Sequence, residues 1–377
     1  MPTIHARQRD RRGAIAVLAA FTLVVMLAMV AFAIDIGVIL VAKSDLQRSA
    51  DAAAHAAAVE YCRISDATTP GNQLDIAGTY VGSNKVLNEF MRVSASKQGL
   101  SSDVTLGHIN FANLSEPMSF ANPALFNAVR VTVRRDGTLN PHVPLFFGKI
   151  FAQQSVAVQA ESTAAVIRNI SGFKIPHHGE NLPFLPIVIS LDMWESGLQQ
   201  NVDSWSWNSG SKEIGRNPDG VPEVVLFPNA TDSSGNLGTV NVGPSNNNST
   251  SRLSKQIRSG LNPGDLQPYG GEISLDSSGQ LPLSGNPGLS ASLQDDLASI
   301  AGEPRIVGLF SKVVGSGSTA DFTIVKFVAI RLMTVNLSSG EKYVTVQPAP
   351  FTFSGVLESQ FDHQTSGYVF SPTAFVR

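Results

Sequence analysis

Cysteine is nearly absent from this sequence of 377 residues, because Cys62 is the only one. A single cysteine cannot form an intrachain disulfide, which excludes a disulfide-stapled scaffold as well as a cysteine-rich metal site. Cys62 itself is expected to be an inert small side chain, since no residue that would activate a thiol is apparent near it. The stability of the chain must therefore come from burial of apolar surface.

The chain also lacks a large net charge of either sign. The formal net charge is −3, and charged residues make up 15% of the chain. A nucleic-acid-binding domain would carry a basic surplus, so the sequence predicts no nucleic-acid partner. The hydrophobic content of 43% is too high for a disordered chain. We therefore expect a folded protein.

Motifs for catalysis and cofactor binding are missing as well. The glycine-rich pieces match neither a phosphate-binding loop nor a nucleophile elbow. His177, His178 and Glu180 form the one tight group of metal-type ligands, but adjacent histidines cannot both face one site. Asp232 and Asp276 each begin an Asp-Ser-Ser-Gly segment, which is typical of a β-turn and lacks the alternating acids of a calcium loop. We predict no catalytic residue, no cofactor, no metal site and no enzymatic activity.

The segment PIVISLDMWES, residues 186–196, is the nearest approach to a metal motif. Domains of the von Willebrand factor A type carry Asp-x-Ser-x-Ser at this kind of strand end. Here Asp192 and Ser196 fit, but Trp194 stands in place of the first serine, and an indole supplies no ligand oxygen. We therefore expect no metal at Asp192. Trp194, Trp205 and Trp207 are interpreted as packing residues, with a sugar-facing patch as the alternative.

One long apolar run is present, from Ala14 to Ile34, and it contains no charged residue. A helix of this length covers about 30 Å, the thickness of the hydrocarbon core of a bilayer. Arginines at 7, 9, 11 and 12 precede it, and such basic residues stay on the cytoplasmic side. The sequence predicts a basic cytoplasmic tail over residues 1–12, a retained transmembrane helix, and export of the rest. A secretory signal peptide is the alternative, but its apolar core would be shorter.

The helix is expected to continue beyond the apolar run as a stalk to residue 62. Asp35, the one acid in the extended apolar stretch, lies about 33 Å along the axis from Gly13, which predicts a place at the far membrane interface. The alternative is a buried partner for another membrane helix. We expect the stripe of small residues that follows to pack on the chain's own core, with a partner helix as the alternative. This stripe comprises Leu46, Ala50, Ala53 and Ala57.

After residue 63 the periodicity changes to two, which predicts strands, most strongly at 127–135 and 155–166. A short helix is expected at 87–93. The apolar segment 141–151 between the strong strands is interpreted as a buried connector, with an exposed partner-binding loop as the alternative. These elements form a predicted β-rich domain over residues 63–170.

The predicted second domain, residues 171–377, begins in a linker rich in turn formers at 168–186. It is expected to be mainly β, and its patterns also indicate helices at 249–260 and 289–302. The fold class predicted for the whole chain is α+β. Its parts are a transmembrane and stalk helix over 13–62, followed by a mostly β exported region with a few short helices.

Residues 11–58 closely resemble the N-terminal membrane module of TadE- and TadG-like proteins of the Flp (tight adherence) pilus-assembly system. The features that carry the resemblance are the paired arginines with a glycine, the apolar span, an Asp-x-Gly, a Leu-Gln, and an Ala-Asp-Ala-Ala-Ala run. The segments 127–135, 143–151 and 155–164 also look like the exported part that trails this module. Beyond residue 170 the resemblance is thinner, and the incomplete motif at Asp192 departs from family members with a von Willebrand type domain.

The resemblance implies a single-pass protein of the bacterial inner membrane with a periplasmic C-terminal region. Its implied partners are membrane lipid and other Tad/Flp or envelope proteins. The Arg-Arg-Gly before Ala14 is similar to a prepilin peptidase junction, but Leu18 stands where a pilin has its glutamate, so we expect an uncleaved anchor. The hypothesis is a non-enzymatic accessory protein of pilus assembly or adhesion. The rival is a membrane-tethered binding module or enzyme that acts on a glycan or another envelope ligand.

Overall fold

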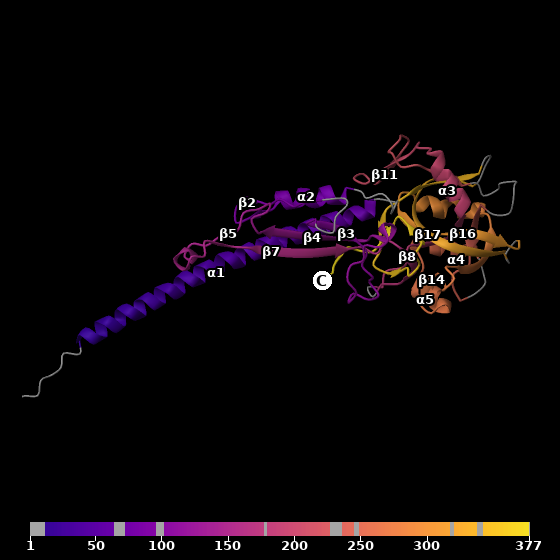
Figure 1. The fold of residues 1–377 in the computed structure, drawn as a ribbon. Coiled ribbons are helices and arrows are strands. Elements are labelled where there is room, and N and C mark those ends of the chain that lie inside the picture. Colours follow the sequence, from indigo (N-terminus) through magenta and orange to yellow (C-terminus); the bar gives the residue numbers. More distant parts are fainter. Residues whose placement is uncertain are drawn as a thin grey trace, which may run out of the picture.

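The computed structural model describes residues 12–63, 72–95, 102–176, 179–226, 236–244, 249–316, 320–337 and 342–376. Figure 1 shows an elongated molecule in which one long helix leads into a narrow helix-and-sheet unit and then into a broader β-rich unit. We call these the N-terminal module, residues 12–166, and the C-terminal domain, residues 170–370. A long N-terminal helix followed by mostly β structure confirms the predicted α+β class. Of the predicted cytoplasmic tail, residues 1–11 lie outside the described residues.

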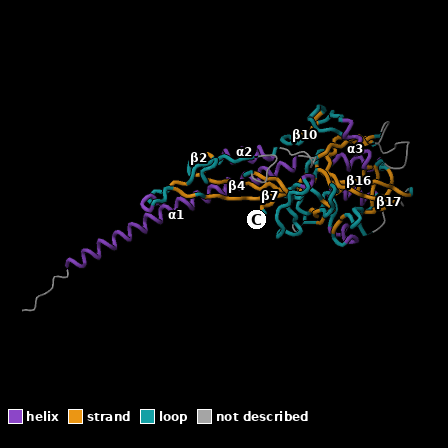
Figure 2. The backbone as a smooth tube through the Cα atoms, viewed as in Figure 1, coloured by secondary structure: helices purple, strands orange, loops and turns teal. Residues whose placement is uncertain are grey.

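Helix α1 runs unbroken from Arg12 to Glu60 over 49 residues. Alanine, leucine and other straight-chain residues favour the helix, and no proline interrupts it. Within the described part of the chain, this is the one helix that is long and apolar enough to cross a membrane. Its side chains from residue 15 to residue 30 are all exposed. Figure 2 shows that this end of α1 extends away from every other element.

The N-terminal module packs α1 against a four-stranded antiparallel sheet. The strand order is β23 (Ala374–Phe375), β7 (Val158–Ala165), β4 (Ala128–Arg135) and β3 (Val104–Gly107). The alternation predicted for β4 is confirmed, because its valines are fully buried while the side chains between them are partly exposed. Helix α2 (Gln73–Ser83) lies beside α1 (Figure 1) and was not predicted.

The stripe of small residues on α1 packs on the module's own core, as predicted. Its four members have no exposed surface and share one cluster with the valines of β4. Small side chains allow the helix to approach the sheet closely. The predicted helix at 87–93 is wrong, because β1 (Lys85–Val86) and β2 (Glu89–Phe90) form a hairpin there. Leu87 and Asn88 both have positive φ, the conformation that a tight two-residue hairpin turn requires.

The C-terminal domain is built on a closed ring of five hydrogen-bonded strands. In order around the ring they are β9 (Phe184–Ser190), β13 (Leu237–Val240), β15 (Leu281–Pro287), β17 (Ala320–Asn336) and β16 (Pro304–Val314). Strand β16 closes the ring because it pairs antiparallel with β17 and parallel with β9. The far half of β17 also pairs antiparallel with β18 (Tyr343–Pro348), which in turn pairs with β12 (Val224–Leu226).

Strand β9 of the ring buries both of its faces. In β9, Phe184 and Val188 belong to one core, and Leu185, Ile187 and Ile189 belong to another on the opposite face. Burial on both faces accounts for the continuous apolar run of this strand. The second core is covered by α3 (Leu191–Gln200), α4 (Thr250–Ser259) and α6 (Gln294–Ser299), which each contribute buried side chains to it. Helices α4 and α6 fall where the sequence predicted them.

Shorter elements surround the ring. Strand β8 (Ile170–Lys174) lies between β14 (Glu272–Ser274) and β20 (Val356–Glu358), and β10 (Ser206–Asn208) pairs with β11 (Glu213–Gly215). Two short parallel pairings involve β21 (Ser366–Gly367) with β17, and β19 (Phe351–Thr352) with β22 (Val369–Phe370). Helix α5 (Pro263–Leu266) completes the domain. The segment predicted as a linker, 168–186, therefore contains β8 and the start of β9.

Candidate functional site

Asp35 is held by the backbone of a loop more than 100 residues away in sequence. This loop, residues 145–154, connects β5 (Val143–Pro144) to β6 (Ser155–Val156), and we call it the tip loop. Asp35 Oδ1 accepts a hydrogen bond from the Phe146 N–H at 2.8 Å, and Oδ2 accepts one from the Gly148 N–H at 2.7 Å. The Phe147 N–H lies 3.3 Å from Oδ1 and 3.1 Å from Oδ2. The side chain is only 6% exposed.

These hydrogen bonds bear on whether Asp35 is a buried partner for another membrane helix. Three successive N–H groups converge on one carboxylate, which is the geometry of a backbone anion nest. The carboxylate is satisfied inside its own chain, so it does not present a free group to another membrane helix. The same contacts hold the tip loop against α1, and η3 (Gly148–Phe151) forms within that loop.

Polar side chains of α1 also cover the outer edge of β7. Lys43 Nζ donates to the Gln159 carbonyl, and Gln47 Nε2 donates to the Glu161 carbonyl at 3.1 Å. Further along the same strand, the Val376 N–H donates to the Thr163 carbonyl at 2.8 Å. Each of these carbonyls would otherwise be an unpaired group on a sheet edge. The edge of β7 is therefore occupied by the chain itself at these positions.

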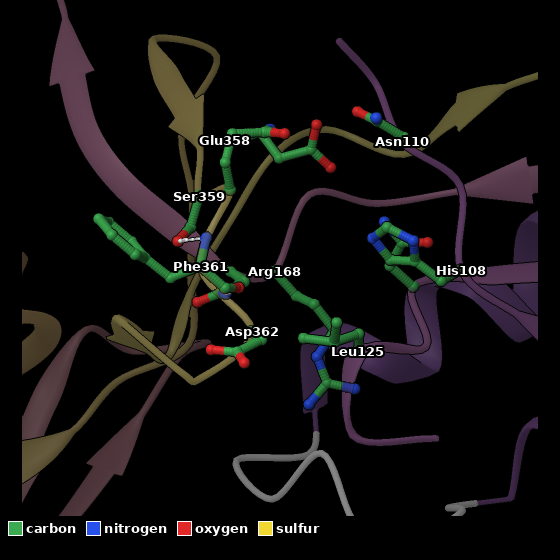
Figure 3. Close-up of a pocket in the computed structure, with 11 residues that line it drawn as sticks. His108, Asn110, Leu125, Arg168, Glu358, Ser359, Phe361 and Asp362 are labelled. Carbon is green, nitrogen blue, oxygen red and sulfur yellow. Dashed lines mark hydrogen bonds between the residues drawn. The ribbon is translucent and has the colours of Figure 1, made fainter. Parts of the chain in front are cut away.

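A cavity of about 160 Å³ lies where the N-terminal module meets the C-terminal domain. Figure 3 shows His108, Asn110 and Leu125 from the module on one side and Glu358, Ser359, Phe361 and Asp362 on the other, with Arg168 between them. A hydrogen bond from the Phe111 N–H to Glu358 Oε2, at 3.0 Å, bridges this junction. In the segment that links the two parts, Asn169 Oδ1 accepts from the Thr365 N–H at 2.8 Å.

Two titratable groups of the cavity are perturbed by their surroundings. Burial raises the pKa of Glu358 above its ordinary value of 4.5, although backbone N–H donors from Phe111 and Ala112 act in the opposite direction. Burial lowers the pKa of His108, and the carboxylate of Glu116 opposes that change. Arg168 is occupied, since its guanidinium stacks 5.3 Å from the Tyr61 ring and donates to the Phe126 carbonyl at 3.3 Å. The bonds across this junction join the two parts of the chain.

The residues weighed for metal chemistry are not brought together. Within the described ranges, no group of three or more His, Cys, Asp or Glu side chains is placed to hold a metal ion. Asp192 is exposed on the first turn of α3, and the Ser196 hydroxyl donates to the Met193 carbonyl at 3.3 Å. Strand β9 ends at Ser190, so both residues of the incomplete motif lie on a helix and not at a strand end. His177, His178 and Asp232 lie outside the described residues.

The turn predicted at Asp276 is confirmed. Asp276 Oδ1 accepts from the Ser278 and Gln280 N–H groups, and the Asp276 carbonyl accepts from the Gly279 N–H at 2.9 Å. The positive φ of Gly279 suits this turn. At Cys62, burial raises the pKa of the thiol to about 11, so the thiolate is scarce at neutral pH and the side chain is unreactive, as the sequence predicted.

The tryptophans pack as expected. Trp194 is 3% exposed in the core under α3. Trp205 and Trp207 are half-buried, and the guanidinium groups of Arg216 and Arg331 lie over their rings at 4.9 Å and 4.8 Å. A ring covered by an arginine does not offer that face to a sugar. Packing is therefore the interpretation that the contacts favour.

Two protein-family models match the part of the chain that forms the long helix and the sheet packed against it. A family model described as Flp pilus-assembly TadE/G-like matches residues 13–60, and a second, described as Tad-like Flp pilus-assembly, matches residues 42–164. Residues 13–164 are therefore similar to proteins of Flp pilus assembly of the TadE/G-like kind. No curated protein and no solved structure matches it significantly.

The two matches support a role in pilus assembly, and α1 is a candidate membrane anchor. The two matched ranges together span α1, the sheet strands β3, β4 and β7, and the tip loop. The matched residues therefore comprise the helix with most of its sheet, and the ring of the C-terminal domain lies outside them.

Proposed function

We propose that this protein is a non-enzymatic accessory component of Flp pilus assembly or adhesion, anchored in the inner membrane by α1. Its periplasmic region works by contact with other pilus or envelope proteins. The observation that carries this proposal is the continuity of α1. One unbroken helix forms both the apolar span and the core of the N-terminal module. The anchor and the exported region therefore form a single stiff unit.

The chemistry of the described residues supports a contact role. The acid of the incomplete metal motif, Asp192, stands exposed on a helix, and the one thiol is partly buried with a raised pKa. The basic residues before the apolar run support a cytoplasmic N-terminus. In this orientation the long axis of α1 carries the C-terminal domain away from the membrane.

Complementation of a deletion strain tests the proposal. The double variant Leu23→Arg/Val24→Arg should abolish assembled surface pili, because each arginine at the centre of a span costs about 2.5–3.5 kcal/mol on the insertion scale. Leu139→Arg is the matched control, since Leu139 is an exposed leucine outside the span and should tolerate the charge. Sheared pili and adherent cells would be quantified, with the protein level checked by immunoblot.

The variant Asp192→Ala distinguishes the proposed contact role from the alternative, a tethered enzyme or ligand-binding module. A contact protein should retain nearly wild-type pili and adhesion with this variant, because Asp192 belongs to no complete catalytic or metal site among the described residues. Loss of function at a normal protein level would contradict the non-enzymatic role and favour a tethered enzyme or ligand-binding module.

The orientation has its own test. Alkaline phosphatase fused after Arg377 should be active, because this enzyme works only outside the cytoplasm, and the full-length chain keeps its fold in the fusion. An inactive fusion present at a normal level would reverse the topology. N-terminal sequencing of the extracted protein would also show whether the anchor is uncleaved, as we propose.

A further inference from the structure

The tip loop exposes a dense group of large apolar side chains. Phe146 is 68% exposed, Phe147 37%, Ile150 74% and Phe151 71%. The four lie within six consecutive residues, and the charged Lys149 stands among them, also exposed. The sequence favoured a buried connector at 141–151, and the structure contradicts it for this part. Isolated exposed apolar residues need no explanation, but a contiguous group of them indicates a contact surface.

The place of the tip loop along α1 identifies what it contacts. The loop is bound to Asp35, which directly follows the apolar run that ends at Ile34. Ala31 lies one turn earlier on the same face of α1 and is also buried, whereas residues 15–30 are exposed. If residues 14–34 fill a hydrocarbon core about 30 Å thick, the tip loop stands at its outer boundary. Figure 1 shows β5 at the end of the module nearest the bare part of α1.

The polar groups of the loop are arranged for this environment. Non-helical backbone is tolerated at membrane depth only where its N–H groups are satisfied by protein. Asp35 accepts hydrogen bonds from three of them, those of Phe146, Phe147 and Gly148. The long side chain of Lys149 can extend its ammonium group to the lipid phosphates while its carbons remain in the apolar zone.

We propose that the tip loop is a second membrane contact, inserted in the outer leaflet beside α1. Its apolar side chains enter the boundary between headgroups and acyl chains, and the Asp35 nest fixes the loop at that depth. Two contacts restrict the tilt of α1 and its module in the bilayer, so the C-terminal domain is held at a set angle to the membrane. This inference rests on the proposed anchor and goes beyond the proposed role in pilus assembly.

Spin labels on the full-length protein test the contact. Cys62→Ala removes the one native cysteine, and Ile150→Cys or Phe151→Cys then places a nitroxide on the tip loop at a position that is already exposed. The protein would be reconstituted in vesicles of phosphatidylethanolamine and phosphatidylglycerol. Collision rates with oxygen, which concentrates in the bilayer, would be compared with those of a water-soluble nickel chelate. Both tip labels should collide several-fold more with oxygen than with the chelate.

Two further labels serve as references for the lipid and the water environment. Leu27→Cys reports the span itself, and Val314→Cys reports an exposed apolar residue of the C-terminal domain in water. Tip labels that behave like the one at 314, while the label at 27 remains in lipid, would overturn the tip contact and leave the anchor intact. Tip labels shielded from both reagents would show a second copy seated on the loop, which also overturns the proposal. A label at 27 that meets the chelate would overturn the anchor and this inference together.

Discussion

At the scale of single residues, Glu358 shows how a carboxyl can join two parts of a chain. It lies on β20 of the C-terminal domain, yet it accepts a hydrogen bond from the Phe111 N–H in the N-terminal module. The donors favour the ionised form, whereas burial favours the neutral one. Burial prevails, since the pKa of Glu358 is raised. The ionised group is therefore held at a cost to the folded state.

That balance predicts a pH dependence of stability. The folded-state pKa of Glu358 lies above its ordinary value of 4.5. The stability that Glu358 contributes to the folded protein is therefore fully present below about pH 4.5 and is lost as the pH rises through the raised pKa. Glu358→Gln keeps an oxygen that can accept from the Phe111 N–H but cannot ionise. We expect wild-type stability to fall relative to this variant as the pH rises from 4.5, until Glu358 is fully ionised. Urea unfolding in detergent between pH 4 and 8 would measure the difference in free energy of unfolding between the two proteins. Parallel pH profiles would contradict a raised pKa of Glu358.

At the scale of elements, the ring of strands depends on close backbone contacts that only glycine permits. Strand β15 approaches β13 so closely at Gly285 that a Cβ there would lie 2.0 Å from the Thr239 carbonyl oxygen. At Gly238 a Cβ would lie 2.4 Å from the Phe322 ring. The contact at Gly285 holds β15 close to β13, the contact at Gly238 leaves room for the Phe322 ring of β17, and a bulkier residue at either position would force its neighbour away.

Gly285→Ala should therefore destabilise the C-terminal domain by about 1–3 kcal/mol, the usual cost of overpacking. Gly78→Ala is the matched control, because Gly78 lies inside α2 with no atom within 4 Å of the added Cβ. That control should stabilise the protein by about 0.5–1 kcal/mol through helix propensity. Thermal melts followed by circular dichroism would compare the two variants, and a neutral Gly285→Ala would show that the strands can separate without cost.

At the scale of the whole molecule, the end of the chain returns to the N-terminal module. Phe370, on β22, is 3% exposed in the core under α1, and β23 pairs with β7. The Ile167 N–H also donates to the Ser371 hydroxyl at 2.8 Å. The N-terminal module is therefore completed by Phe370, at the end of the C-terminal domain, and by residues that follow it.

Phe370→Ala should destabilise the N-terminal module by about 3–5 kcal/mol, because it removes a large buried side chain and leaves a cavity. Phe375→Ala is the control, since Phe375 is 55% exposed and should change stability by no more than about 0.5 kcal/mol. Hydrogen exchange of the β4 and β7 peptides in detergent would locate the effect. If Phe370→Ala loosened only the C-terminal domain, the module would prove independent of the chain end.

The sequence by itself determined the features that depend on neighbouring residues. The apolar run predicts a membrane-spanning helix, alternating valines predict β4, and the spacing of small residues predicts the buried stripe of α1. Each of these signals is local, either an unbroken run or a period that repeats within a few turns or residues. The absence of a complete metal motif around Asp192 was also visible, because it depends on which side chains stand at fixed short spacings.

The tertiary structure decided what depends on residues far apart in the chain. The tip loop lies more than 100 residues from Asp35, and Phe370 lies more than 200 residues from the sheet that it helps to bury. The closure of the ring required β16 to pair with both β9 and β17. No local period encodes such pairings, because they are selected by the register and packing of whole elements. The exposed side chains of the tip loop were missed for the same reason: an apolar segment reads alike whether it is covered by its own chain or left for the membrane.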